Sequence, residues 1–238
     1  MKIWTFWDKI EKLWSLRGLF LESLGYSLLI ALAAVLLGFI IGVILAVIRI
    51  APKRNVVIKF LDKIAEIYIT IIRGTPTLVQ LLILYNSVLV FFKSLDTNLL
   101  VPIIAFGINS GAYMAEIIRS GITSVDKGQM EAGRSVGLSW ITTMRKIVIP
   151  QAIKIVVPTI FNEIIMLVKE TSVVSYIVLR VNNKQKYDLL GMAEKQGLAT
   201  PACYLAFLFA AALMYLAVVL LLTFIQHTIE RSLKKNER

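Results

Sequence analysis

The sequence predicts an all-α integral membrane protein with five membrane-spanning helices. Of its 238 residues, 58% are apolar and only 17% are charged, whereas a soluble domain has about 45–50% apolar and about 25% charged residues. Long apolar runs without a charge divide the chain, and the basic residues behind its net charge of +11 lie mostly between these runs. This composition excludes a disordered chain and argues against a single soluble domain.

Five segments are long and apolar enough to predict the spans. Ser23–Ile48 and Ala202–Ile225, the densest part of the last apolar run, carry no charge, and each can cross about 30 Å of hydrocarbon as a helix. Thr97–Ala115 predicts a third span. Val56–Phe92 and Ile147–Tyr176 are apolar but contain charged residues. We interpret the former as one long, tilted or broken helix whose charged half faces protein or water.

The ends of the chain predict an orientation. Residues 1–20 predict an amphipathic helix on the membrane surface, because apolar residues recur among charged ones near helical spacing; a simple anchoring tail is the alternative. With five spans the termini lie on opposite sides, and a cytoplasmic C-terminus places more Lys and Arg inside. We therefore expect an interfacial helix (1–20), a transmembrane domain (21–230) and a basic cytoplasmic tail (231–238).

The sequence lacks the residues that several kinds of chemistry require. The one cysteine, Cys203, and the one histidine, His227, permit neither an internal disulfide nor a metal cluster. The sequence has no phosphate-binding loop of the Gly-x-x-x-x-Gly-Lys-Ser/Thr type and no paired nucleophile and base. We expect no catalytic residue, no metal and no nucleic-acid partner, so the protein is not expected to be an enzyme.

Polar side chains inside the spans are the candidate ligands, because an ionisable group there is costly and faces protein or a wet cavity. Glu163 lies near the middle of its span, with Met166 on the same helical face. Asn109 and Tyr113 share a face of the third span and can form hydrogen bonds. The alternative for Glu163 is an ion pair between helices, and for the other two it is helix packing.

The run Arg73-Gly74-Thr75-Pro76 predicts a break in a long helix, because proline removes a backbone donor and glycine loosens the chain. Freed backbone groups are tolerated in a membrane where they line a cavity. We expect Thr75 and the backbone at Gly74 to be ligands. Arg73 either attracts a substrate carboxylate or pairs with Glu66.

The loop 120–146 between the third and fourth spans predicts a short helix, a glycine stop and a second helix. Glu131–Val136 is compatible with a helix, and Gly137 suits the positive φ of a helix end. Ser139 can cap a helix that starts at Trp140. A short helix along the membrane surface can dock in a groove of a partner and pass rigid-body motion to the spans.

This loop also resembles the "EAA" loop of ABC importer permeases. It reads Glu-Ala-Gly, three residues, Gly, nine residues, Ile, one residue and Ile-Pro; Gly133 and Ile149 depart from the usual alanine and leucine. Flanking motifs resemble polar amino acid permeases of the histidine/glutamine/arginine type over roughly residues 20–230. They are Arg73-Gly74-Thr75-Pro76 with Gln80, Gly111-Ala112-Tyr113 with Glu116 and Arg119, and Lys169-Glu170-Thr171-Ser172, where that family more often has Asp in place of Glu170.

The resemblance implies a transmembrane subunit of the type I ABC importer permease kind in a bacterial inner membrane, with an external N-terminus and a cytoplasmic C-terminus. The implied partners are a second permease (a copy or a close paralogue), two cytoplasmic ATPases that hold ATP and Mg, and an external solute-binding protein. The residues expected at the ATPase contact are Glu131, Ala132, Gly133 and Gly137.

We therefore expect import of a polar amino acid. A cationic one (arginine, lysine or histidine) comes first, because Glu163 can receive an ammonium or guanidinium group and repels acidic side chains. Glutamine is the alternative, because Glu163 could hold only the α-amino group. A membrane scaffold without a pathway and an ion-coupled carrier are further alternatives, although carriers usually show inverted repeats and more spans.

Overall fold

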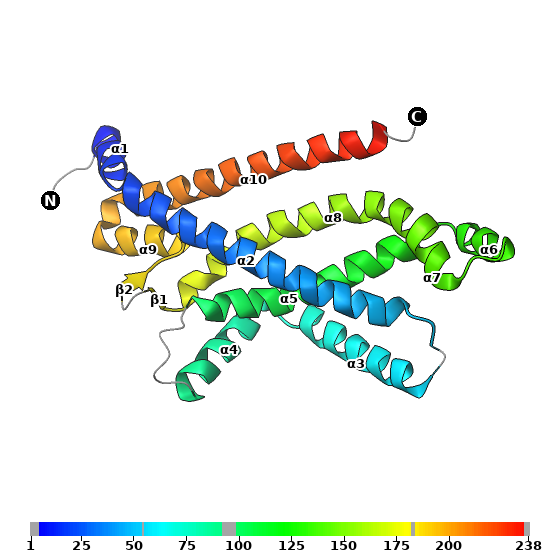
Figure 1. Cartoon of the computed structure of the whole chain (residues 1–238). Helices are drawn as coiled ribbons and strands as arrows, with labels where there is room; N and C mark the ends of the chain where they lie inside the picture. Colours follow the sequence, from blue (N-terminus) through cyan, green and yellow to red (C-terminus); the bar gives the residue numbers. More distant parts are fainter. Residues whose placement is uncertain (1–4, 54, 92–98, 182–183, 236–238) are drawn as a thin grey trace. The chain divides into compact units, whose positions relative to one another are not determined.

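The computed structural model describes residues 5–53, 55–91, 99–181 and 184–235, which are mostly helical (Figure 1). In chain order the elements are α1 (Phe6–Ser15), α2 (Arg17–Ile50), α3 (Val56–Arg73), α4 (Thr77–Phe91), α5 (Leu100–Thr123), α6 (Lys127–Ser135), α7 (Trp140–Thr143), a π-helical turn (Met144–Val148), α8 (Ile149–Glu170), a 3-10 segment (Thr171–Tyr176), β1 (Leu179–Val181), β2 (Lys184–Lys186), α9 (Leu189–Ala199), a 3-10 turn (Pro201–Cys203) and α10 (Tyr204–Lys235).

The predicted fold class is confirmed. Four helical segments among the described residues are long and apolar enough to cross a membrane: Arg17–Ile50, Leu100–Thr123, Trp140–Tyr176 and Pro201–Leu233. The pair α3 and α4 makes a fifth if it counts as one broken span. Several helices are longer than the apolar runs that predicted them, because long polar side chains at a helix end can reach water while their stems stay apolar.

The N-terminal helix begins at a reciprocal capping box. The Thr5 hydroxyl accepts a hydrogen bond from the Asp8 amide at 3.2 Å, and the Asp8 carboxylate accepts one from the Thr5 amide at 2.8 Å. Leu16 then separates α1 from α2. The segment 1–20 that we expected on the membrane surface thus includes α1 and the first turn of α2. No residue of α1 is buried; its place on a membrane surface stays a prediction, and residues 1–4 lie outside the described residues.

The chain divides into two compact units. The first contains the described residues of 1–34, 76–106 and 165–221, and the second those of 35–75, 107–164 and 222–235. The helices α2, α5, α8 and α10 contribute residues to both units. Of the predicted site residues, only Met166 belongs to the first unit.

The core of the first unit joins α9 and the start of α10 to the start of α2. The rings of Phe20 and Phe207 lie 5.9 Å apart between centroids, and Cys203 is fully buried beside them. Gly197 permits the tight turn from α9 to α10, because a Cβ there would lie 2.0 Å from Cδ2 of Tyr204. The helix α9 thus ends at Ala199, before the predicted span Ala202–Ile225 begins.

Asp188 caps α9 in this unit. Its carboxylate accepts hydrogen bonds from the amides of Leu190 at 3.0 Å and Gly191 at 3.2 Å, while the Leu189 amide donates to the Ser27 hydroxyl at 3.0 Å. The Asp188 side chain is buried, and this burial raises its pKa to about 7. The cap therefore titrates near neutral pH.

A small antiparallel hairpin, absent from our sequence expectations, also belongs to the first unit. Leu179 of β1 lies opposite Lys186 of β2. Lys186 forms an ion pair with Glu22 of α2, and this contact raises the pKa of Lys186. Strands of three residues that carry several cations lack the apolar alternation by which a strand is recognised in a sequence.

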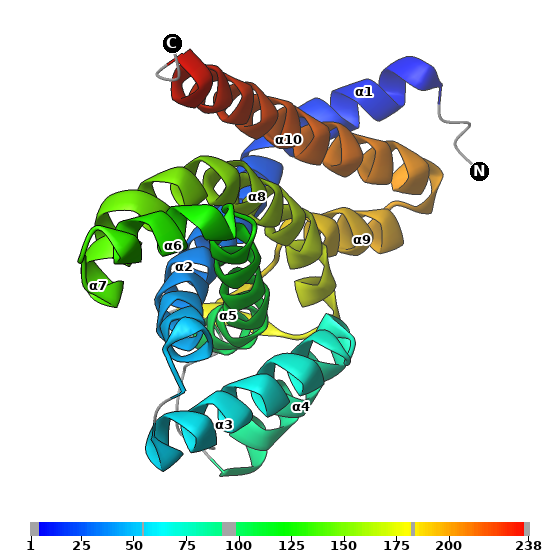
Figure 2. The same cartoon turned by 90° about the vertical axis from the view of Figure 1, so that its right-hand side faces the viewer.

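In the second unit, the later half of α2 packs closely on α5 (Figure 2). A Cβ on Gly42 would lie 2.4 Å from Cβ of Met114, and one on Gly38 would lie 2.8 Å from Cβ of Ser110. Small residues at such positions let two membrane helices approach closely. This pair is the support on which α3 and the loop after α5 are positioned.

Candidate substrate pathway and coupling loop

The predicted helix break lies at Gly74, Thr75 and Pro76, in the second unit and at its boundary. The Gly74 amide donates to the Thr70 carbonyl at 3.0 Å, and the Thr75 hydroxyl donates to the Ile71 carbonyl at 2.9 Å. A Cβ on Gly74 would lie 2.8 Å from the Thr70 oxygen, so a glycine fits best there. Because Pro76 has no amide hydrogen, the helix cannot continue with its normal hydrogen bonds.

Arg73, the last residue of α3, lies against Tyr113 of α5. Its guanidinium carbon is 5.1 Å from the centre of the Tyr113 ring, which is a cation–π contact. The Tyr68 hydroxyl donates to the Ile108 carbonyl at 2.6 Å and joins the same two helices. The structure thus brings two predicted site residues together. Glu66, the alternative partner of Arg73, forms its ion pairs in a separate cluster.

Asn109 occupies the closely packed part of α5 and is only 3% exposed. Its neighbours Gly107 and Gly111 face α2: a Cβ on them would lie 2.5 Å from Cδ2 of Leu37 and 2.7 Å from Cγ2 of Ile41, respectively. The glycines therefore serve helix packing. Asn109 is the buried side-chain amide of this closely packed segment.

Glu163 and Met166 lie on α8 but differ in exposure. Glu163 is 8% exposed, whereas Met166 is 50% exposed. A carboxylate buried in a span must have its charge compensated, which marks it as a candidate functional group. Met166 belongs to the first unit and Glu163 to the second. The only relation between the two residues is therefore their spacing along α8.

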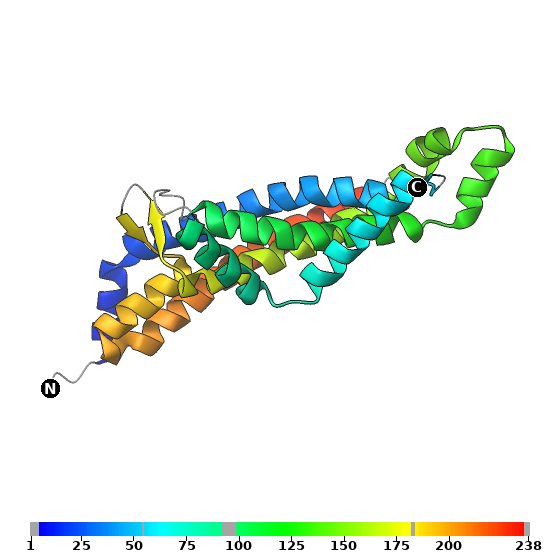
Figure 3. The ribbon, with the colours of Figure 1, turned by 90° about the horizontal axis from the view of Figure 1, so that it is seen from below.

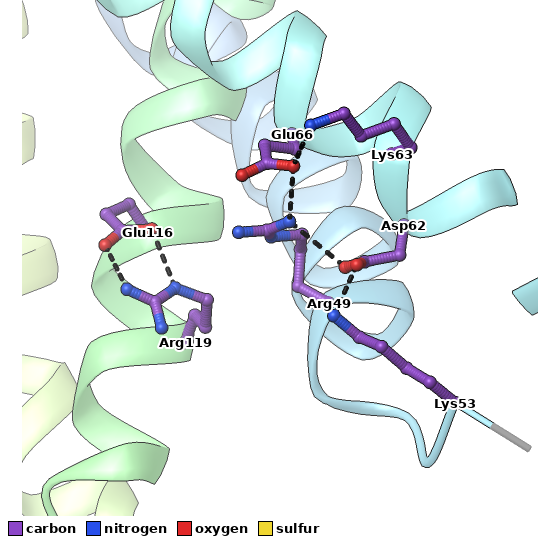
Figure 4. A network of polar contacts seen from close by, with 7 residues as sticks. All are labelled: Arg49, Lys53, Asp62, Lys63, Glu66, Glu116 and Arg119. Carbon is purple, nitrogen blue, oxygen red and sulfur yellow. Dashed lines mark hydrogen bonds and ion pairs between the residues drawn. The ribbon is translucent and has the colours of Figure 1, made fainter. Parts of the chain in front are cut away.

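A charge cluster that the sequence analysis did not identify joins α2 to α3 (Figure 4). The Arg49 guanidinium donates to the Asp62 carboxylate at 3.1 Å and lies 3.9 Å from that of Glu66. Lys53 also pairs with Asp62, and Lys63 pairs with Glu66 at 2.9 Å. Only the spacing of Lys63 and Glu66 on one helix could have been recognised in the sequence. The pairs between helices depend on the fold.

A second ion pair lies within α5 (Figure 4). The Arg119 guanidinium donates to both carboxylate oxygens of Glu116, at 2.9 Å and 2.5 Å. Two parallel hydrogen bonds of this kind fix both side chains in geometry as well as charge. Glu116 therefore stabilises Arg119 and is a poor candidate for a substrate ligand.

The loop 120–146 folds as predicted, and α6 and α7 extend beyond the ends of α5 and α8 (Figure 3). Gly137 has a φ of 85°. Its amide donates to the Arg134 carbonyl, and the Leu138 amide donates to the Gly133 carbonyl, both at 3.1 Å. These are the two hydrogen bonds of a Schellman stop. Positive φ, where glycine is favoured, explains why this residue ends α6.

The second helix of the loop starts at the predicted cap. The Ser139 hydroxyl accepts from the Thr142 amide at 3.1 Å. Among the four expected coupling residues, Glu131, Ala132 and Gly137 are exposed, whereas Gly133 is buried. A Cβ on Gly133 would lie 2.4 Å from Cγ2 of Thr143. Three of these residues are therefore presented outward, and Gly133 holds α6 against the second helix.

A cleft of about 480 Å³ connects this loop to the corner between α2 and α3. Its walls come from both segments. The lining residues are Pro52, Asn55, Ile58, Arg134, Ser139, Trp140 and Ile141. Among the described residues, no three His, Cys, Asp or Glu side chains gather closely enough to hold a metal ion.

The comparisons with known proteins all match this chain to membrane components of transport systems. The model of the family described as "Binding-protein-dependent transport system inner membrane component" matches residues 38–235. The chain is 36% identical to the arginine transport system permease protein ArtQ of Bacillus subtilis, over 91% of this chain and 93% of that protein. It is 37% identical to the L-cystine transport system permease protein TcyB of the same organism, over 84% and 82%.

A putative glutamine transport system permease protein GlnP of Rickettsia typhi is 34% identical, over 91% of each chain. Among solved structures, an amino acid ABC transporter crystallised with histidines superposes with a TM-score of 0.83 at 33% identity, over 98% of this chain and all of that one. The MetNI methionine ABC transporter superposes with a TM-score of 0.75 at 17% identity, over 92% and 98%. The latter likeness concerns the fold.

Proposed function

Because this chain belongs to the family of binding-protein-dependent transport system inner membrane components, we propose that it is the transmembrane subunit of an ATP-driven importer of a cationic amino acid. The names of its relatives include arginine, glutamine and cystine, which supports an amino acid substrate without selecting one. The choice among them rests on the charges within the spans of this chain.

The observation that carries a cationic substrate is the carboxylate of Glu163, which is 8% exposed within α8. An ammonium or guanidinium group compensates such a charge, whereas the side chain of glutamate or aspartate is repelled by it. Arginine, lysine and histidine are therefore the proposed substrates.

A zwitterion also needs a cation for its carboxylate. Arg73 supplies it at the helix break, where stacking on Tyr113 holds the guanidinium in place. The backbone at Gly74 and Thr75 adds polar groups beside it, and Asn109 contributes an amide from α5. Met166 is assigned an apolar contact. Each assignment extends the local geometry to a bound substrate.

Coupling to ATP hydrolysis is assigned to the loop 120–146. Glu131, Ala132 and Gly137 are exposed and form the proposed contact with an ATPase subunit. Gly133 lies inward, so in this proposal it transmits the movement of α6 to Thr143 of α7 and to Ile147 of the π-helical turn before α8. ATP and Mg belong to the ATPase in this proposal, and the permease does no covalent chemistry itself.

The proposed complex contains two permease subunits, identical or paralogous, with two cytoplasmic ATPases and an external solute-binding protein. It lies in the bacterial inner membrane. The distribution of Lys and Arg between the spans supports a cytoplasmic C-terminus and an external N-terminus. The apolar face of α1, with its exposed tryptophans, supports a place on the outer leaflet.

Replacing Glu163 by glutamine tests the substrate assignment. We expect Glu163→Gln to weaken uptake of arginine at least about tenfold, or about 1.4 kcal/mol, in vesicles that contain the ATPase and internal ATP. Glu11→Gln, which removes a carboxylate from the exposed face of α1, is the control and should transport normally. Unchanged uptake in Glu163→Gln would make Glu163 a structural residue.

The same assay addresses the alternative, which the relatives named as glutamine permeases favour. If Glu163 binds a cationic side chain, the substitution should lower arginine uptake more than glutamine uptake. An equal loss for both would mean that Glu163 binds the α-amino group. ATP-independent uptake would identify a carrier, and no uptake of any amino acid by the complete complex would favour a scaffold.

A further inference from the structure

An apolar groove runs along the surface of the second unit between three helices. It has a volume of about 370 Å³, and its lining side chains are all aliphatic or aromatic. One wall extends along α2 from Phe39 to Ile50, the other along α8 from Ile149 to Ile160, and Ile118 and Ile122 of α5 lie between them. Several of these side chains are exposed, including Phe39 and Val47. Nothing within the described chain fills the groove.

The length of the groove matches one leaflet of a bilayer. Each wall covers eleven residue steps, so at 1.5 Å per residue the groove is about 16 Å long. The hydrocarbon of a bilayer is about 30 Å thick, and one leaflet therefore provides about 15 Å. Both walls belong to segments that are long and apolar enough to span a membrane. The groove thus begins at the end of a span and stops near its middle.

Cations lie just beyond one end. Arg145 and Lys146 are both exposed, and they lie in the π-helical turn that directly precedes Ile149, the first residue of the α8 wall. Neither forms an ion pair within the part of the chain that the structure describes. Lys53, near the end of the α2 wall, is already paired with Asp62. Arg145 and Lys146 thus bring two exposed positive charges to this end of the groove.

We propose that the groove is a binding site for an anionic phospholipid, with an acyl chain along α2, α5 and α8 and the phosphate held by Arg145 and Lys146. Hydrocarbon contact does not distinguish this lipid from its neighbours, because all lipid tails are equally apolar. Selectivity comes from the phosphate, since each basic side chain near the surface favours an anionic lipid by about fivefold. Two such side chains predict a preference of up to about 25-fold, so we expect at least about tenfold.

The lining argues against a protein helix as the occupant. Interfaces between membrane helices are enriched in small residues that let the backbones approach, whereas this groove is lined mainly by Ile, Val and Phe, with Ala46 and Ala152 as the small ones. The proposal relies on the proposed orientation only to assign the lipid to the inner leaflet.

Native mass spectrometry of the full chain in detergent tests the site directly. The protein is titrated with phosphatidylglycerol and, separately, with phosphatidylcholine of the same acyl chains. We expect the first phosphatidylglycerol to bind about tenfold more tightly or better, and Arg145→Gln with Lys146→Gln to remove this preference. Lys195→Gln with Arg231→Gln removes the same charge from exposed positions elsewhere and should retain it.

A second pair of variants tests the groove itself. Ile153→Trp fills it at a residue that is 46% exposed, whereas Leu220→Trp adds the same bulk at an exposed position on α10. Only the former should lose the bound lipid. Equal affinity for the two lipids, or a preference that survives loss of both cations, would overturn the proposal. So would an effect of Ile153→Trp on dimer mass instead of lipid binding, which would make the groove an interface between copies. None of these readouts requires transport, so the proposed function can fail independently.

Discussion

Replacing Gly133 by alanine is expected to loosen the packing of α6, and removing one methyl group from Thr143 is expected to restore it. A Cβ on Gly133 would lie 2.4 Å from Cγ2 of Thr143, 3.0 Å from its Oγ1 and 3.2 Å from Cδ1 of Ile147. Favourable contacts between carbon atoms lie at about 3.5–4.0 Å. The predicted clash is therefore concentrated on one methyl group.

The expected size follows from the cost of overpacking. Adding a methyl group to a closely packed site costs about 1–3 kcal/mol. At about 1.4 kcal/mol for each factor of ten, amide exchange from local opening of α6 should become about 5- to 150-fold faster. Thr143→Ser removes Cγ2 but keeps the hydroxyl, which donates to the Ser139 carbonyl at 3.0 Å. The double variant should therefore regain most of the lost protection.

Hydrogen exchange of the full chain in detergent, read on peptides from α6, measures this effect. Gly25→Ala is the matched control, because a Cβ there meets nothing within 4 Å and should leave α6 unchanged. In the four-way comparison of the wild type, the two single variants and the double variant, the interaction between the substitutions should be stabilising. Normal protection in Gly133→Ala, or a double variant no better than it, would refute the packing argument.

Three further outcomes are expected. Gly137→Ala should destabilise the loop by about 1–2 kcal/mol, because residue 137 has a left-handed backbone conformation. Gly137→Asn should destabilise it by less. The same hydrogen-exchange assay measures both losses, and equal losses would contradict this reason. The folded state holds a proton on Asp188 between its ordinary pKa of 3.8 and its raised pKa of about 7, so the free energy of unfolding of the first unit should fall as pH rises across that interval. Asp188→Asn should remove this pH dependence, which is measured by amide hydrogen exchange of α9 at each pH. Lys184→Cys and Lys127→Cys, in a chain without Cys203, should be labelled from opposite sides of sealed vesicles, and labelling of both from one side would refute the topology.

The spans and the loop could be predicted because their signals are local. Charge-free runs reveal helices of membrane length, and Gly74 with Pro76 reveals a break wherever the helix is placed. The φ of Gly137 and the cap at Ser139 likewise depend on a few adjacent residues. Such features need no knowledge of what packs against them. The same locality explains why helix ends were misplaced, since charged residues can extend a helix into water.

Features that join distant segments could not be predicted in the same way. In the sequence, Asp62 is one acid in the charged half of a helix. Only the fold brings to it Arg49 of α2 and Lys53 of the linker that follows α2. The hairpin is joined to α2 by an ion pair between Lys186 and Glu22, which lie far apart in the sequence. For the candidate ligands, the sequence supplied residue types and helical spacing. It could not supply the stacking of Arg73 on Tyr113.

Gly133 combines a local sequence motif with a contact that depends on the fold. The loop resembles a motif that usually has alanine at this position, and from the sequence alone the glycine is a mild departure. In the folded chain Thr143 already occupies the space that an alanine methyl would need. The methyl group of Thr143 on α7 thus fills the space that an alanine methyl at position 133 on α6 would occupy. It follows that Gly133→Ala should be tolerated only together with a smaller residue at position 143. Related loops with alanine at the first position should then have a residue smaller than threonine at the second.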